Sequence, residues 1–309
     1  MTGYELREMR PQDRLPVAEL ICLSTNAWYQ AHGKPLIFSG GPRTTELHFD
    51  LYHSLEGSSG WVAEDTRSGA IIGSCFQHIR PTHVSLGIMN VHPNHFGRGV
   101  AHALLQTIVR VAEREDKPLR LVSSAMNLDS YSLYTRAGFV PRQAYQDMYL
   151  AVPKNGLNKM VAGLDLVRPA TLADVPLMAE LELAVSGIRR DGDYRHFIEN
   201  PEGIWHVSVF ESAPHRLEGF LVSCAHPGCN MVGPGVMRED EVTAALLLTE
   251  LNQHHGRTPV FLLPVDRNAL VREVYSWGGR NCEMHFSQVL GSFTPFQGVN
   301  MPTFLPETA

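Results

Sequence analysis

A long stretch of this chain occurs twice. Sliding the sequence by 141 residues places 91–139 on 232–280 without a gap, and the openings 6–20 and 166–181 also resemble one another. The nine identical pairs in the ungapped stretch are Val91/Val232, Pro93/Pro234, Ala103/Ala244, Leu105/Leu246, Pro118/Pro259, Leu121/Leu262, Asn127/Asn268, Tyr134/Tyr275 and Gly138/Gly279. An internal repeat identifies the unit that folds, so it constrains the architecture more than any local pattern does. The sequence predicts one fold in two copies, at 1–150 and 164–309, joined by a linker at 151–163.

The first copy shows the periodicities of a sheet combined with helices. Alternating apolar residues predict strands, and apolar residues at helical spacing predict helices. The predicted strands are 60–65, 70–79, 84–91, 119–123 and 140–150, and the predicted helices are 99–115 and 130–137. We therefore expect an α/β fold of two tandem domains, each a mixed, mostly antiparallel sheet flanked by helices.

Composition limits the classes to which the chain can belong. Hydrophobic residues make up 44% and charged residues 19%, a balance typical of a globular protein with a buried core. The net charge of -6 and the lack of a basic run argue against nucleic-acid binding. No apolar stretch approaches the roughly 20 residues that span a bilayer, and the charged N-terminal residues do not resemble a signal peptide. Because the five cysteines are few and odd in number, we expect a cytoplasmic protein that binds neither nucleic acid nor membrane.

The sequence VHPNHFGRGVAHALL, residues 91–105, joins a predicted strand to a predicted helix through a loop with glycines. The first amides of a helix have no partner within the helix, and the helix dipole adds partial positive charge, so such junctions bind phosphate groups. Gly97 and Gly99 let the backbone approach a ligand closely, and Arg98 adds a positive charge. A loop that only has to turn would use the same glycines, so this motif alone leaves both interpretations open.

A second motif lies in the next strand-to-helix connection, where Asn127 and Tyr134 precede Gly138 and Phe139. With both motifs in this order, about residues 4–150 resemble the GCN5-related N-acetyltransferases (GNATs). That family carries V-x-P-x-x-[Q/R]-G-x-G-x-[G/A], followed by an N…Y-x-x-x-G-F segment. The resemblance implies that acetyl-CoA is the acyl donor.

The resemblance also implies roles for individual residues. Main-chain groups of Asn90 and Val91 would pair with the pantetheine arm, and Asn127 would hydrogen-bond it. Backbone amides would hold the pyrophosphate along the loop formed by Phe96, Gly97, Arg98, Gly99, Val100 and Ala101. Phe96 stands where the family has Gln or Arg, so a side-chain contact is lost there while the backbone amide remains.

The implied mechanism is direct attack of a substrate amine on the acetyl carbonyl. The departing coenzyme A thiolate needs a proton, and a phenol with a pKa of about 10 can supply one when it is held in reach. Tyr134 is the candidate for this general acid. Tyrosines also pack short helices with only the hydroxyl in water, but the motif context favours catalysis.

The sequence does not identify the general base that would deprotonate the acceptor. The predicted strand 84–91 carries no acidic residue. Glu64, His78 and His83 are candidates, as is a base that acts through water.

Three further features are ambiguous. Three side chains on a predicted helix either line the acceptor pocket or pack against their neighbours: Trp28, Tyr29 and His32. Cysteines and histidines within 224–229 and 282–285 are zinc-ligand types, but their spacing is not that of a known zinc motif, so we expect no metal. The tail from Pro295 either docks as an extended segment on a domain or a neighbouring subunit, or is disordered.

The second copy differs from the first at the predicted phosphate loop. Residues 97–100, Gly-Arg-Gly-Val, are replaced at 238–241 by Arg-Glu-Asp-Glu. Acids in the first turn stabilise a helix, but they would repel a pyrophosphate. We interpret the second copy as a degenerate domain that does not bind the cofactor.

Together these features predict a tandem acetyltransferase whose first copy transfers acetyl from acetyl-CoA to an amine of a small molecule. A peptide or protein amine is the alternative acceptor, and a non-catalytic acyl-CoA-binding regulatory protein is the alternative outside enzymes. Aminoacyl transfer from charged tRNA is disfavoured by the net charge of -6. The sequence leaves a homodimer open.

Overall fold

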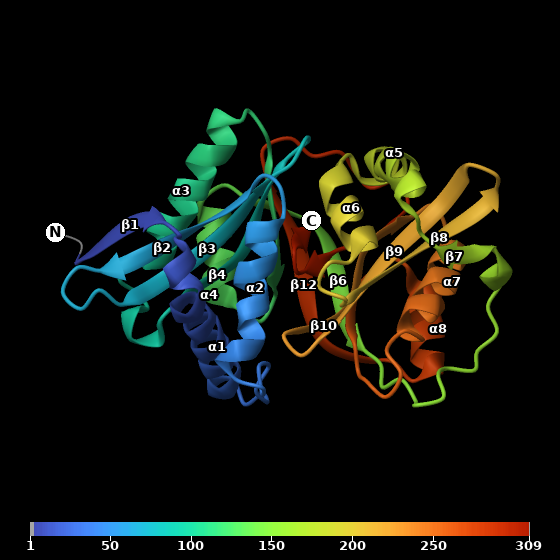
Figure 1. Ribbon diagram of the computed structural model, residues 1–309, viewed down its shortest axis with the longest axis horizontal. Coiled ribbons are helices and arrows are strands. Elements are labelled where there is room, and N and C mark those ends of the chain that lie inside the picture. Colours follow the sequence, from blue (N-terminus) through green and yellow to red (C-terminus); the bar gives the residue numbers. More distant parts are fainter. Residues whose placement is uncertain (1–2, 309) are drawn as a thin grey trace. The chain divides into compact units, whose positions relative to one another are not determined.

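The computed structural model describes residues 3–308 (Figure 1). Its contacts divide the chain into two compact units. The first unit runs to Leu119 and also includes Phe304–Glu307, and the second runs from Arg120 to Thr303. Within residues 3–308, no helix combines the length and the apolar composition that crossing a membrane requires.

The first unit contains a four-stranded antiparallel sheet in the order β1-β2-β3-β4. Its strands are β1 (Tyr4–Glu8), β2 (Ser58–Asp65), β3 (Ile71–Ile79) and β4 (Val84–Val91). The β3–β4 register is irregular, because Cys75 faces Met89 and Gln77 faces Leu86. One residue of β3, Phe76, is therefore opposed by Gly87 and Ile88 of β4. The extra residue forms a β-bulge, a device that re-aims backbone and side chains at sheet edges and sites.

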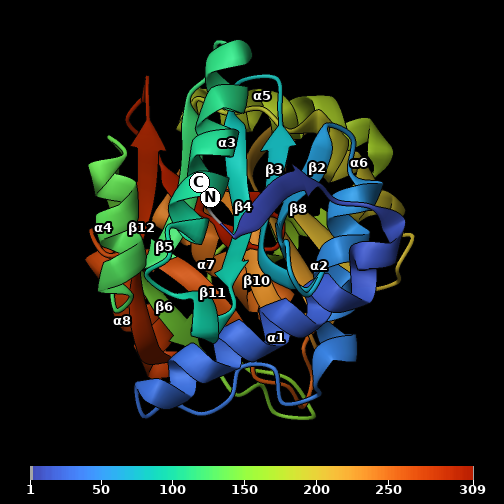
Figure 2. The ribbon, with the colours of Figure 1, turned by 90° about the vertical axis from the view of Figure 1, so that its left-hand side faces the viewer.

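Three helices accompany this sheet: α1 (Arg14–Ala31), α2 (Pro42–Ser54) and α3 (Val100–Arg114). Helices α1 and α2 lie side by side (Figures 1 and 2), and the Thr45 hydroxyl of α2 donates to the Ala18 carbonyl of α1 at 2.7 Å. Helix α3 packs on β3 at Gly73, where a Cβ would come within 2.6 Å of Val100 Cγ1. The apolar spacing that predicted this helix is therefore the spacing of its buried face.

The second unit contains strands in the order β5-β12-β6-β11-β10-β9-β8-β7, with β13 paired to β10. Its strands are β5 (Leu119–Ser124), β6 (Val140–Tyr149), β7 (Val167–Pro169), β8 (Trp205–Ala213), β9 (Arg216–His226), β10 (Cys229–Met237), β11 (Val260–Pro264), β12 (Arg280–Leu290) and β13 (Val299–Met301). Its helices are α4 (Leu128–Arg136), α5 (Val175–Ser186), α6 (Asp191–Glu199), α7 (Asp240–Leu251) and α8 (Asn268–Trp277). Near the C-terminus, β14 (Thr303–Phe304) pairs with β15 (Glu307–Thr308).

The two copies exchange strands within the second unit. Strand β6 of the first copy lies between β12 and β11 of the second, with Tyr149 opposite both Arg280 and Val260. Strand β12 in turn lies beside β5 of the first copy, where the Ala125 amide donates to the Met284 carbonyl at 2.8 Å. Figure 1 shows the green β6 beside the red β12.

The repeat and the compact units therefore divide the chain at different places. The compact units separate at Leu119 because β5 and β6 pair with strands of the second copy. Residues 151–163 contain neither helix nor strand. The division into 1–150, 151–163 and 164–309 remains a prediction about the repeat.

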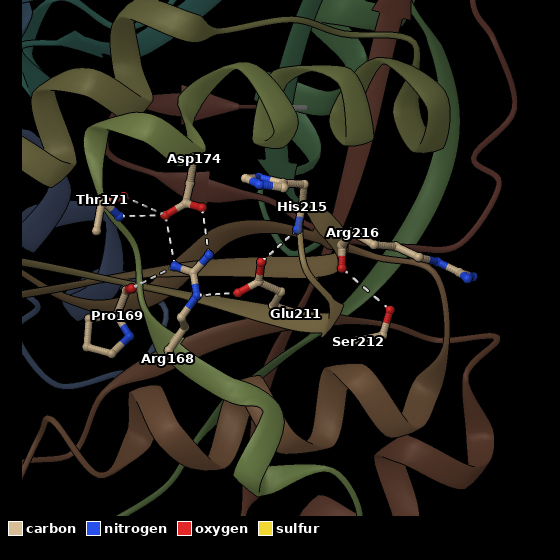
Figure 3. A network of polar contacts seen from close by, with 8 residues as sticks. All are labelled: Arg168, Pro169, Thr171, Asp174, Glu211, Ser212, His215 and Arg216. Atoms are coloured by element: carbon tan, nitrogen blue, oxygen red, sulfur yellow. Dashed lines mark hydrogen bonds and ion pairs between the residues drawn. The ribbon is translucent and has the colours of Figure 1, made fainter.

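The repeat is visible in matching ion-pair networks. In the second copy, Arg168 forms two hydrogen bonds with Asp174, at 2.9 and 2.8 Å, and one with Glu211 at 2.7 Å (Figure 3). In the first copy, Arg7 forms two hydrogen bonds with Asp13, at 2.6 and 2.9 Å, and one with Glu64 at 2.6 Å. In both copies, one arginine thus connects the first strand to the following 3₁₀ turn and to the second strand.

Candidate functional site

The predicted phosphate loop is an open turn at the start of α3. Gly97 and Gly99 have φ angles of 74° and 79°, in the left-handed region that favours glycine. A Cβ at either position would meet no atom within 4 Å, so both glycines face open space. Glycine is therefore required here by backbone conformation, and the space beside it is available to a ligand.

The amides of this loop divide into two groups. The Phe96 amide donates to the Pro93 carbonyl at 3.2 Å, and the Arg98 amide donates to the His95 carbonyl at 3.4 Å. Within the described part of the chain, the amides of four other residues have no hydrogen-bond acceptor: Gly97, Gly99, Val100 and Ala101. These four donors lie at the positive end of the dipole of α3, the arrangement that suits a diphosphate. Of the six backbone amides at 96–101 that the resemblance assigns to the pyrophosphate, four are therefore without an acceptor within residues 3–308.

Basic side chains surround the loop. Arg98 is exposed, and the side chain of Phe96 is 54% exposed beside it. The rings of His92 and His95 are 5.7 Å apart. Burial and the charge of His95 lower the pKa of His92, so its ring is neutral at pH 7 and its Nδ1 accepts the Asn94 amide. The fixed positive charge at this loop is therefore that of Arg98.

Asn90 and Val91 end β4, directly before the loop. Their backbones pair with Ser74 and Gly73 of β3. The Asn90 side chain donates from Nδ2 to Ser24 Oγ at 2.7 Å, which fixes the end of β4 to α1. Both residues thus lie in the first unit with the loop.

Asn127 and Tyr134 lie in the second unit, at the two ends of α4. Asn127 caps the helix, because its Oδ1 accepts the Ser130 amide at 3.1 Å. Capping leaves the Nδ2 group of this side chain as the donor for a ligand. Tyr134 is 7% exposed, and its ring lies 5.8 Å from that of Phe139. The structure assigns a local role to each, and their roles toward a cofactor remain predictions.

The candidate bases and pocket residues have defined surroundings in the first unit. Glu64 is held by Arg7, as Glu211 of the second copy is held by Arg168, so this carboxylate has a structural role. His78 and His83 are both buried, and His78 Nδ1 is hydrogen-bonded to the hydroxyl of Ser58. On α1 and its C-cap, three rings pack on one another: Trp28 stacks on His32 at 4.0 Å and contacts Tyr29 edge-on at 5.1 Å.

In the second copy, the residues aligned with 93–96, directly before the phosphate loop, form the end of a strand. Strand β10 continues through this region and pairs with β9 as far as Met237, opposite Gly219. Its other edge pairs with β11 only at Met231 and Val232. From Gly235 to Met237, this edge of β10 pairs instead with β13, with Met301 opposite Gly235. The tail therefore fills the edge that β10 exposes where it separates from β11.

The acids of the second copy occupy the start of α7. Glu239 is the N-cap, and its carbonyl accepts the Thr243 amide at 3.1 Å. Asp240 and Glu241 follow in the first turn, and Asp240 lies 3.5 Å from Arg267 Nη1. The positive end of this helix therefore faces carboxylates of its own chain.

A buried acidic cluster, Asp147, Glu283 and His285, lies where β6 pairs with β12. His285 Nδ1 lies 3.5 Å from Asp147 Oδ2, and Ser124 donates to Glu283 at 2.5 Å. Burial, reinforced by the charge of Glu283, raises the pKa of Asp147 to about 7. Burial also lowers the pKa of His285 to about 4, so this imidazole is neutral at pH 7.

Asp147 makes the stability of the protein depend on pH. An unfolded aspartate has a pKa near 3.9, so between about pH 4 and 7 only the folded form holds the proton. The stabilisation is complete below pH 4 and is lost as the pH rises through 7. The Asp147→Asn variant stays neutral, so we expect its free energy of unfolding relative to the wild type to rise by up to about 1.4 kcal/mol per pH unit over this window. Urea unfolding at pH 5, 6, 7 and 8 measures this difference.

The control for this prediction is Asp165→Asn, at an exposed position of the same unit. Its stability should follow the wild type at every pH. If the curves of Asp147→Asn and the wild type run parallel from pH 5 to 8, then Asp147 is ionised in the folded protein and the prediction is wrong.

All five cysteines are free, and Cys224 is buried in the second unit. In the range 3–308, no group of three His, Cys, Asp or Glu side chains is placed to hold a metal ion.

Known proteins resemble this chain in sequence over part of its length and in fold over nearly all of it. Residues 56–141, which include the bulge and the phosphate loop, match the model of the acetyltransferase (GNAT) domain. The chain is similar to the solved structure of a putative acetyltransferase from Pyrococcus horikoshii, with 17% identity, a TM-score of 0.73, and coverage of 99% of this chain and 96% of that one. It is also similar to a tandem GNAT protein from the clavulanic acid biosynthesis pathway, with 14% identity, a TM-score of 0.61, and coverage of 93% and 98%.

Among curated proteins, the chain is 30% identical over 102 residues to UPF0157 protein YqkA of Bacillus subtilis (strain 168). This match covers 33% of the chain and 28% of the length of that relative. At identities below 25%, the similar structures establish the fold. Residues 56–141 therefore match the GNAT acetyltransferase domain, and the chain as a whole has the fold of a tandem GNAT protein.

Proposed function

We propose that this protein transfers an acetyl group from acetyl-CoA to an amine of a small molecule, and that the first copy carries the reaction. The observation that carries the proposal is a set of four amides at Gly97–Ala101 that lack acceptors among the described residues, beside two glycines that face open space, in a stretch that matches the GNAT domain. A diphosphate would supply the missing acceptors. The exposed Arg98 adds a charge-assisted contact.

The contrast between the copies supports the assignment of the reaction to the first. In the second copy, the residues aligned with 93–96 continue strand β10, and β13 occupies its edge. Acids at Glu239–Glu241 replace the anion site. The second copy thus acts as a structural partner that supplies strands.

In the proposed reaction, the acceptor amine attacks the acetyl carbonyl directly. Asn127 donates from its amide group to the pantetheine arm, and Tyr134 protonates the coenzyme A thiolate as it leaves. These two roles come from the family resemblance. The acceptor is a small-molecule amine in this proposal, and a peptide amine is the alternative.

Substitution of Tyr134 tests the proposal. We expect Tyr134→Phe to lower the rate of coenzyme A release about 10²-fold, because the thiolate loses its proton donor. The dissociation constant of acetyl-CoA should change less than about threefold, since the hydroxyl acts on the leaving group. Free-thiol release measures the rate, and isothermal titration calorimetry measures the affinity.

A matched control is Tyr131→Phe, on the same short helix. Its rate should stay near that of the wild type. A protein that binds acetyl-CoA but releases no thiol with any acceptor would be an acyl-CoA-binding regulator instead of an enzyme. A protein that does not bind acetyl-CoA would contradict both functions.

A further inference from the structure

The last residues of the tail place a carboxylate inside the first unit. Residues Phe304–Glu307 belong to this unit, although the chain before them lies in the second. The Glu307 residue is only 8% exposed. The sequence allows the tail from Pro295 to be either docked or disordered, and over its described residues it is docked.

Glu307 lies against Tyr52, a fully buried residue of α2. The Glu307 amide donates to the Tyr52 hydroxyl at 3.4 Å. The ring of Tyr52 stacks on that of Phe76 at 4.4 Å, opposite the β4 bulge. The backbone amide of Ile88, in the bulge, also hydrogen-bonds the Tyr52 hydroxyl. One hydroxyl group therefore joins Glu307 to the irregular point of β4.

The Glu307 carboxylate lacks a partner for one of its oxygens. Oε2 is shielded from solvent and has no hydrogen bond with any residue that the structure describes. Such a buried polar atom costs free energy unless a proton or a ligand satisfies it. The groups that act on it electrostatically are Tyr52 on α2, Cys75 on β3 and Arg80 after β3. Burial raises the pKa of Glu307 well above its usual value, and the charge of Arg80 opposes this rise.

No other carboxylate of the first unit fits the role of the missing base as well. Strand β4 carries no acid. Glu64, the acidic candidate from the sequence, is paired with Arg7. Glu46, which is also buried, forms an ion pair with Arg14. Among the carboxylates that the structure describes in the first unit, only Glu307 combines burial, an unsatisfied oxygen and a connection to the β4 bulge.

We propose that Glu307 is the general base of the first copy and receives the ammonium group of the acceptor. This inference rests on the proposed function. It makes the acceptor a primary amine that arrives protonated, because a cation is the ligand that a buried carboxylate selects.

Glu307 takes a proton from R–NH3+, the freed lone pair attacks the acetyl carbonyl, the C–N bond forms and the C–S bond breaks. The nitrogen loses two protons. One passes through Glu307 to solvent, and the other balances the proton that Tyr134 gives to the thiolate. Because burial raises the pKa of Glu307 well above its usual value, its carboxylate is a stronger proton acceptor than that of an exposed glutamate.

The test is Glu307→Gln in the full-length protein, which keeps the shape of the side chain and removes its basicity. The probes are acetyl-CoA with water as the acceptor, and acetyl-CoA with putrescine, tyramine or glucosamine. We expect thiol release to fall about 10²-fold with unchanged acetyl-CoA affinity. The wild-type rate should fall at low pH as Glu307 is protonated, and this limb of the pH profile should be absent in the variant.

The matched control is Glu56→Gln, at an exposed position of the same unit, which should behave as the wild type in both rate and pH profile. A structural role in holding the tail would lower the melting temperature of Glu307→Gln but leave the pH profile intact, and that outcome would overturn the inference. A rate for Glu307→Gln within threefold of the control would also overturn it, while the proposed function would stand. A wild-type protein that releases no thiol with water or any amine would overturn the proposed function, and the inference with it.

Discussion

The Gly99→Asp variant is expected to lose acetyl-CoA binding. The substitution places at the start of α3 the acid that stands at Asp240 in the second copy. Its carboxylate would accept the free amides of Val100 and Ala101 and would repel a diphosphate. Since each charge-assisted hydrogen bond contributes about 1.5–3 kcal/mol, loss of two with added repulsion should raise the dissociation constant at least ~10³-fold. Calorimetric titration with acetyl-CoA measures the change.

The control for this variant is Gly99→Asn. Asparagine matches aspartate in shape and tolerates the left-handed conformation that Gly99 adopts, with φ 79°. We expect it to weaken binding about tenfold or less, because it adds no negative charge. If the two variants lose affinity equally, shape and not charge closes the site. If Gly99→Asp binds like the wild type, the amides at this helix start do not hold the cofactor.

The largest effect on stability is expected from Glu182→Gln. Glu182 on α5 is fully buried, accepts two hydrogen bonds from Arg190 Nε, at 3.0 and 3.1 Å, and accepts the Tyr194 hydroxyl. Arg190 is 2% exposed. Removing the carboxylate leaves a buried guanidinium without its counter-charge, which costs about 3–5 kcal/mol. Urea unfolding at pH 7 measures the loss.

Two variants check this explanation. Glu180→Gln changes an exposed residue of the same helix and should shift the free energy of unfolding by less than about 0.5 kcal/mol. The double variant Glu182→Met with Arg190→Met removes both charges together and should recover most of the lost stability. A double variant as unstable as Glu182→Gln would show that the loss comes from packing and not from the unpaired charge.

The sequence predicts the elements of the first copy well. The predicted strand 84–91 is β4 itself, and the predicted helix 99–115 differs from α3 by one residue at each end. These elements follow from local periodicity, which does not depend on what the strands pair with. The exchange of β6 and β12 could not be predicted, because either strand would satisfy the same hydrophobic pattern beside either copy.

The phosphate loop of the candidate site can be predicted from the sequence in the same way, whereas Glu307 cannot. The glycines at 97 and 99 mark the loop because their conformation is required there, and the helix start explains the free amides. Glu307 has no comparable signal. It lies in a short tail with little periodicity, and only the folded chain places it beside Tyr52. Glu307 lies more than two hundred residues after the phosphate loop along the chain, so no motif of fixed spacing connects the two in the sequence.

The exchange of β6 and β12 has a genetic consequence. A gene that encoded only residues 1–150 would yield a β6 without either of its neighbours, and one that encoded only 164–309 would leave β11 and β12 without the strand that joins them. Neither half could be lost by deletion without exposing unpaired strand edges, which promote aggregation. Selection can therefore allow the second half to lose cofactor binding, which fits the acids at the start of α7, but it cannot allow this half to be deleted.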